Sequence, residues 1–310
     1  MKGKGRMTAL PIALFIFSGS MLTLGKGGAS WAIHLILAAA LACFALPVAC
    51  VAAEGVFGGE REKKGIEKVI FIIFSLVSAI AAIYSASLML DEFSSFASRV
   101  MFLRIPSAIV SAIFVAFCSY LASCRAEVIK KFAFVSAIIV FVCSLILFAL
   151  SAPNFEWDRV NELLEGAKEL SATDAVAVFS GSFAPAVIAI IYFSSNGGVR
   201  GRSALFGTLL SFFLILICFL NVFLLLGGSF GASMEYPYAA AVSTVTAGKL
   251  FARLEGFAYI TYYVSSALRV AICVSLVSIL SERVARRKSR ALPYVVGVLV
   301  FAVTLLLSRS

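Results

Sequence analysis

Phe17-Ser18-Gly19-Ser20 and Phe179-Ser180-Gly181-Ser182 are two copies of one tetrapeptide, each inside an apolar stretch long enough to enter a membrane. The copies fall in the first and the sixth of nine such stretches. Small residues of this kind allow two membrane helices to approach closely. They also suit an inverted-repeat transporter, in which matching helices of two five-helix halves are broken and exposed backbone holds the ligand. We favour the second interpretation because the copies occupy positions one and six.

The composition predicts an all-α polytopic membrane protein of about nine transmembrane helices. The 310 residues are 62% hydrophobic and 14% charged, with a mean hydropathy of +1.04, which excludes a soluble domain. The apolar stretches are continuous rather than alternating, so they are helices and not strands, and most approach the roughly 20 residues that span a bilayer. They cover residues 7–24, 30–53, 68–90, 105–123, 131–151, 175–193, 203–226, 254–280 and 291–307. We expect a single transmembrane domain at residues 1–310, with a first repeat at residues 7–151 and a second at residues 175–307.

Lys and Arg residues predict the orientation. Most of the 26 basic residues fall at the chain start and in alternate loops, so the positive-inside rule places the N-terminus in the cytoplasm and the C-terminus outside. The same bias accounts for the net charge of +10 without a nucleic-acid partner. The basic start and apolar body of Met1–Leu24 resemble a signal peptide, but no small-x-small cleavage site follows. We therefore expect a retained first helix.

Two polar stretches are predicted to lie outside the membrane. Residues 153–174 carry apolar side chains at helical spacing among acidic ones, which predicts an amphipathic connector helix on the outer face, with Trp157 as an interfacial anchor. Residues 227–253 contain Pro237 and several small residues. They are too interrupted to span the membrane and too apolar for a free loop, so we expect either short helices folded over an outer vestibule or a surface loop.

Arg269 is the one basic residue within an apolar segment. It lies between Glu255 at the outer end of segment 8 and Leu280 near the inner end, which places it close to the bilayer centre. A charge there costs roughly 2.5–3.5 kcal/mol, so the guanidinium should face a polar interior. Ser265 and Tyr262 share its helix face. In a functional interpretation, Arg269 binds a ligand carboxylate or supplies the positive charge of a coupling ion. In a structural interpretation, it donates hydrogen bonds to the carbonyls of a broken helix, and both interpretations stay open.

Other residues refine the candidate site. Pro185, just after the second tetrapeptide copy, removes a backbone donor and predicts a break in segment 6. In segment 3, Tyr84, Ser85 and Ser87 are candidates to line a cavity. The seven cysteines lack metal-ligand spacing and His34 is the only histidine, so we predict no metal site and no cofactor. Catalytic signatures are missing as well, and the sequence predicts that the chain is not an enzyme.

Several passages resemble the B subunit of the spore germinant receptors. Glu235-Tyr236-Pro237-Tyr238, followed by residues 248–255 with Arg253 and Glu255 at the mouth of segment 8, is the most specific of them. Further similar passages are Gly28-Ala29-Ser30-Trp31, Leu90–Phe96, Ile105-Pro106 and Ala152-Pro153. The similarity covers nearly the whole chain.

The resemblance implies a LeuT-like fold of the amino acid, polyamine and organocation transporter superfamily. It also implies recognition of a small germinant, commonly an amino acid, together with A-type and C-type subunits in the spore inner membrane. By position, the ligand would lie between broken helices 1 and 6, bordered by Ser18, Gly19, Ser20, Phe179, Ser180, Gly181 and Ser182 and near Tyr84, Tyr262 and Ser265.

Two departures from the family pattern bear on function. Relatives often carry a carboxylate in helix 6, where this chain has Pro185-Ala186-Val187, and the family has ten helices where we count nine. A sensor only has to shift its conformational populations on binding, so the first departure favours a germinant-sensing subunit over an amino-acid permease. A membrane scaffold that binds no ligand is the third alternative, which the two breaks and Arg269 disfavour.

Overall fold

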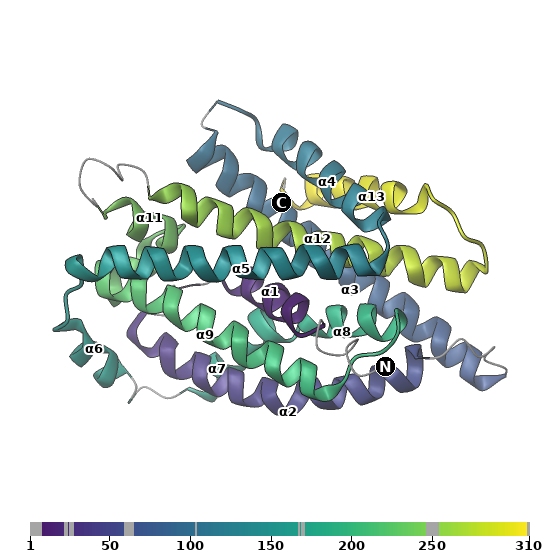
Figure 1. Cartoon of the computed structure of the whole chain (residues 1–310), viewed down its shortest axis with the longest axis horizontal. Helices are drawn as coiled ribbons and strands as arrows, with labels where there is room; N and C mark the ends of the chain where they lie inside the picture. The colour runs from purple at the N-terminus through teal and green to yellow at the C-terminus, as the bar shows by residue number, and fades with distance from the viewer. Residues whose placement is uncertain are drawn as a thin grey trace.

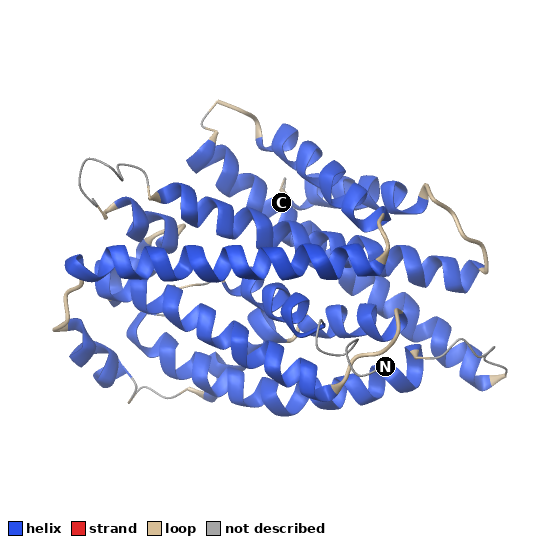
Figure 2. Cartoon of the chain, in the orientation of Figure 1, coloured by secondary structure: helices blue, strands red, loops and turns tan. Residues whose placement is uncertain are grey.

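The structure is a computed structural model that describes residues 8–21, 24, 28–58, 65–102, 104–166, 168, 171–245 and 254–308. Throughout these residues the ordered elements are helices, joined by short turns (Figure 2). This result confirms the all-helical class predicted from continuous apolar segments.

All nine predicted apolar segments are helical. Six helical stretches are long and apolar enough to cross a membrane: Gly28–Phe57, Ile66–Met101, Ala126–Asn154, Ala172–Ser195, Gly201–Leu226 and Glu255–Ala285. Three shorter apolar helices correspond to the remaining segments: α1 (Ala9–Ser20), α4 (Ser107–Ser123) and α13 (Leu292–Leu307). The chain is therefore an integral membrane protein.

Helix α12 (Glu255–Ala285) is the central element of the bundle (Figure 1). Its most apolar window is 83% buried, far more than that of any other candidate span. It packs against α3 (Ile66–Phe96), α4, α5 (Ala126–Ser151), α1 and α8 (Ala186–Ser195). A residue in the middle of α12 is consequently surrounded by protein rather than by lipid.

The remaining long helices enclose this centre. Helix α1 packs on α9 (Gly201–Leu226), and α2 (Trp31–Phe57) covers α9 and α8 from the other side. Helix α13 packs on α4 and α3 at the opposite edge of the bundle (Figure 1). The outward faces of α2, α3 and α5 carry exposed Val, Ile, Leu and Phe side chains, as expected of helices that face lipid.

Short helices form in both polar stretches. Within residues 153–174 the chain forms α6 (Arg159–Gly166), and within residues 227–253 it forms α10 (Gly228–Ser233) and α11 (Pro237–Ser243). Gly227 adopts a positive φ of 81° that ends α9, and Pro237 occupies the first turn of α11, where its missing N–H costs no hydrogen bond. The helix expected in the first stretch is thus present, and the described part of the second stretch forms short helices, one of the two alternatives for it.

Candidate functional site

The two tetrapeptide copies are the points at which regular α-helix stops. Helix α1 ends at Ser20, the last residue of the first copy. The second copy forms η5, a π-helical turn at Phe179–Phe183, between α7 (Ala172–Val178) and α8. Pro185 has no N–H to donate to the Gly181 carbonyl four residues earlier, and the Ala184 N–H instead donates to the Phe179 carbonyl five residues back, at 2.9 Å.

The two copies lie next to each other, and Arg269 lies beside them. A Cβ atom added to Gly19 would stand 3.4 Å from the Gly181 carbonyl oxygen and would collide with Nη1 of Arg269. A Cβ atom added to Gly181 would meet nothing within 4 Å. The guanidinium can approach this closely only because residue 19 has no Cβ atom. At Gly181, by contrast, the position that a Cβ atom would occupy is open.

Arg269 is a buried cation with few partners. Its residue is 7% exposed, and its Nε and Nη2 atoms both donate to Oγ of Ser85, at 3.3 and 3.0 Å. The guanidinium carbon lies 5.0 Å from the ring centroid of Phe15, a cation–π contact. Glu92 attracts it at longer range, but no ion pair to Arg269 exists among the described residues.

The predicted serines mostly bond within their own helices. Ser18 donates to the Phe15 carbonyl at 2.8 Å, Ser180 to the Ala177 carbonyl at 2.9 Å, and Ser265 to the Thr261 carbonyl at 2.8 Å. Ser20 donates to the carbonyl of Ile16 at 3.2 Å. Such back-bonding occupies the hydroxyl hydrogen but leaves the oxygen lone pairs available to a ligand donor.

The predicted residues differ in their access to the centre. Ser18, Ser20, Ser182 and Ser265 are buried, Phe179 is half-buried, and Ser180 and Gly181 are exposed. Tyr84 is 56% exposed, whereas its neighbour Ser85 is 7% exposed and contacts Arg269. Helix α3 thus presents Ser85, not Tyr84, to the centre of the bundle.

A small aromatic cavity adjoins the end of α1. It has a volume of about 30 Å³, and its lining includes Met21, Phe96, Tyr236, Tyr238 and Tyr262. That volume holds one or two water molecules and is too small for an amino acid. Among the described residues, the buried hydroxyl of Tyr262 has no hydrogen-bond partner.

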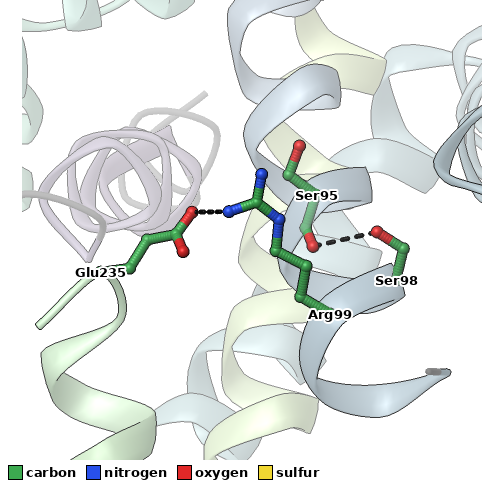
Figure 3. Close-up of polar contacts among 4 residues, drawn as sticks. All are labelled: Ser95, Ser98, Arg99 and Glu235. Atoms are coloured by element: carbon green, nitrogen blue, oxygen red, sulfur yellow. Dashed lines mark hydrogen bonds and ion pairs between the residues drawn. The ribbon is translucent and has the colours of Figure 1, made fainter.

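An ion pair lies beside this cavity. Nη1 of Arg99, in the π-helical turn η3 (Ala97–Met101) after α3, bonds to Oε1 of Glu235 in the linker between α10 and α11 (Figure 3). Tyr236 packs edge-on against Phe96, with ring centroids 5.1 Å apart. Burial and the nearby Glu235 carboxylate raise the pKa of Tyr236 to about 12, so this phenol stays protonated at neutral pH.

The predicted external motif is only partly within the described residues. Pro237 is buried at the start of α11, and Glu255 begins α12. Arg253 lies outside the described residues. The proximity of Glu235 to the cavity, through Tyr236 and Tyr238, connects this motif to the end of α1.

Sequence reasoning missed three features of this region. It did not single out Ser85 as the partner of Arg269, Phe15 as its aromatic contact, or Arg99 as the partner of Glu235. The usable signal for Ser85 was its place in the row of small and polar residues Ser75, Ser78, Ala82 and Ser85, which recur at helical spacing along segment 3. Nothing in the sequence pairs Arg99 with Glu235.

The arrangement combines a buried cation, the end of α1, the π-helical turn η5 and an adjacent aromatic cavity. Among the described residues, no group of three or more His, Cys, Asp or Glu side chains is placed to hold a metal ion. No curated protein matches the chain in a sequence search. A comparison with protein families matches residues 8–310 to the family described as spore germination protein. Because the match covers nearly the whole chain, the chain belongs to this spore germination permease family of membrane proteins.

Proposed function

We propose that the chain is the germinant-sensing membrane subunit of a spore germination receptor and binds an amino acid or a similar small solute. The observation that carries the proposal is the environment of Arg269. This buried guanidinium has five N–H donors, and among the described residues it donates only to Ser85. A ligand carboxylate would supply acceptors that the described residues do not provide.

The position of the cation supports the same site. Nη1 of Arg269 faces Gly19 at the end of α1, and the carbonyl oxygen of Gly181 lies near the same face of that glycine. A ligand carboxylate at Arg269 would therefore have the backbone of both interrupted helices within reach. Carbonyl groups at the end of α1 carry the negative end of the helix dipole and suit the ammonium group of the same ligand.

The closeness of the two copies also supports the proposed LeuT-like inverted-repeat fold. In that architecture, discontinuous helices of the two halves meet at the ligand. Here α1 and η5 contact each other although they are far apart in the sequence. The proposal takes residues 7–151 and 175–307 as the two halves, and A-type and C-type receptor subunits as the partners.

Binding and uptake of labelled amino acids by the purified chain in proteoliposomes test this function. We expect saturable binding without accumulation against a gradient, because a sensor needs only a shift in conformational populations. Accumulation would assign the chain as a permease. If no amino acid binds and Arg269→Gln leaves germination unchanged, the sensing function is wrong and a scaffold role replaces it.

A further inference from the structure

A second and much larger cavity opens at the opposite end of the bundle from Tyr236. Its volume is about 1340 Å³, and it lies among the C-terminal ends of α2, α8 and α12 and the start of α3. These ends lie toward the right in Figure 1. We name it the basic basin, because its lining carries Lys68, Arg283, Arg286 and Lys288 against Glu54 and Glu282.

Hydrogen bonds leave a positive excess in the basic basin. Oε1 of Glu54 accepts the Val199 N–H at 3.1 Å, and Oε1 of Glu282 accepts the Ser289 N–H at 3.0 Å, so both carboxylates are partly satisfied by backbone. Arg283 donates to the carbonyls of Phe57, at 2.9 Å, and of Ser195, where α2 and α8 end. These hydrogen bonds satisfy carbonyl groups at the helix ends that have no partner within their own helix. Four cations against two carboxylates give the lining a formal charge of +2.

Two structural features mark the ends of α8 and α12 beside the basic basin. The hydroxyls of Ser194 and Ser195 are buried and have no hydrogen-bond partner among the described residues, so they lie beneath the surface of the cavity. Arg286 has a φ of 53°, the one positive value at a non-glycine residue in the described part of the chain. This left-handed conformation is the C-cap that ends α12 next to the cavity.

The walls of the basic basin are apolar on the side of α3. Phe71 and Ile72 line it, and Ile72 is 38% exposed. The same helix face continues outward as exposed aliphatic side chains that include Val69, Ile73 and Leu76. A soluble anion would not contact these apolar side chains outside the site, whereas the acyl chains of a lipid would pack along them. Basic pockets between membrane helices are known to hold anionic lipid headgroups.

We propose that the basic basin binds the phosphate group of an anionic membrane lipid. Lys68 and Lys288 supply exposed ammonium groups to the phosphate, and Arg286 supplies a guanidinium. The lipid would hold the ends of α3 and α12 at a fixed separation. Because α12 carries Arg269, such a lipid would act on the central helix from its far end. The binding itself does not depend on the proposed germinant function.

Retention of lipid by the purified full-length chain, measured by native mass spectrometry, tests the proposal. Phosphatidylglycerol and phosphatidylcholine are offered in equal amounts, and we expect the wild type to retain phosphatidylglycerol preferentially. From about 1 kcal/mol for each basic residue near the surface, Lys68→Gln and Lys288→Gln should each lower this preference about 5-fold, and together about 30-fold. Both lysines are exposed, so neither change should disturb folding.

A matched control separates a specific site from general surface attraction. Lys131→Gln combined with Arg202→Gln removes the same charge from exposed residues at the same end of the bundle, outside the basic basin. This control should keep the wild-type preference, and an equal loss in both double variants would overturn the site. Inorganic phosphate is added in a second arm. Displacement of phosphatidylglycerol by phosphate supports the shared headgroup chemistry, whereas phosphate binding without any lipid preference would overturn the lipid assignment.

Discussion

At the scale of single residues, the energy of Arg269 is close to balanced without a ligand. Insertion of a charge at the bilayer centre costs roughly 2.5–3.5 kcal/mol. Hydrogen bonds from a charged group to Ser85 return about 1.5–3 kcal/mol, and the contact with Phe15 adds about 0.5–2 kcal/mol. The chain therefore folds around Arg269 unaided, and the unused donors remain available for binding rather than for stability.

Ser85→Ala tests this balance. The change removes the one hydroxyl to which Arg269 donates, so we expect a loss of stability of about 1.5–3 kcal/mol in thermal unfolding and weaker ligand binding. Tyr84→Phe is the control, because its side chain is 56% exposed and should change stability by less than about 0.5 kcal/mol. A larger effect of Tyr84→Phe than of Ser85→Ala would contradict the placement of α3.

The burial of Arg269 was predicted from the sequence, whereas the rotation of α3 toward it was not. Segment 3 did carry a usable signal, because Ser75, Ser78, Ala82 and Ser85 recur at helical spacing among larger apolar residues and are all buried. Tyr84 and Ser85 are adjacent and point in different directions on a helix. The sequence analysis favoured Tyr84 for the site, and the structure brings Ser85 to Arg269 instead.

At the scale of elements, α1 ends at the first tetrapeptide copy, whereas segment 6 is interrupted within its length by the second copy. Helix α1 has 12 residues, which at about 1.5 Å each span only some 18 Å of a hydrocarbon core about 30 Å thick. Segment 6 is interrupted because Pro185 removes a donor and the second copy forms a π-helical turn. Pro185 allowed the second break to be predicted, whereas the end of α1 rested on the repeat alone.

The ion pair between Arg99 and Glu235 should restrain the linker between α10 and α11 over the aromatic cavity. Both side chains are more than half exposed, so the pair is worth at most about 1 kcal/mol. We expect Glu235→Gln to leave the unfolding temperature nearly unchanged and to speed ligand association several-fold, measured by stopped-flow fluorescence, because the cavity of about 30 Å³ must open for entry.

Charge reversal provides the control for this pair. Arg99→Glu alone should accelerate association, and the double variant Arg99→Glu with Glu235→Arg should restore the wild-type rate, because the pair is re-formed with opposite polarity. A double variant as fast as the single one would show that the pair does not restrain the linker.

At the scale of the whole molecule, the nine apolar segments and the central place of segment 8 follow from hydropathy and from Arg269. The meeting of the two copies was expected only from the inverted-repeat pattern and the family resemblance, because hydropathy contains no information on which distant helices pack together. Helices α10 and α11 were expected only as one of two possibilities, and their contact with the end of α3 through Glu235 was unforeseen. Orientation in the membrane stays a prediction from the basic residues.

Cysteine labelling of intact cells tests that orientation. In a background without the native cysteines, we expect Asn161→Cys in α6 to react with a membrane-impermeant maleimide from outside, and Lys131→Cys at the start of α5 to react only after permeabilisation. Both positions are exposed, so accessibility of the thiol reports the side of the membrane. The reverse pattern would place the N-terminus outside.

The central claim is that a ligand is held at Arg269 between the two tetrapeptide copies. Equilibrium binding of a labelled amino acid to wild type, Gly19→Ala and Gly181→Ala in nanodiscs tests it most directly, because the variants add one methyl group at equivalent positions of the repeat. In Gly19→Ala the new methyl group collides with the guanidinium and displaces it from the ligand carboxylate. A hydrogen bond to a charged group contributes about 1.5–3 kcal/mol, so its loss should weaken binding roughly tenfold to a hundredfold. In Gly181→Ala the methyl group meets nothing within 4 Å, and the affinity should change little. Equal affinities of wild type and Gly19→Ala would contradict the claim.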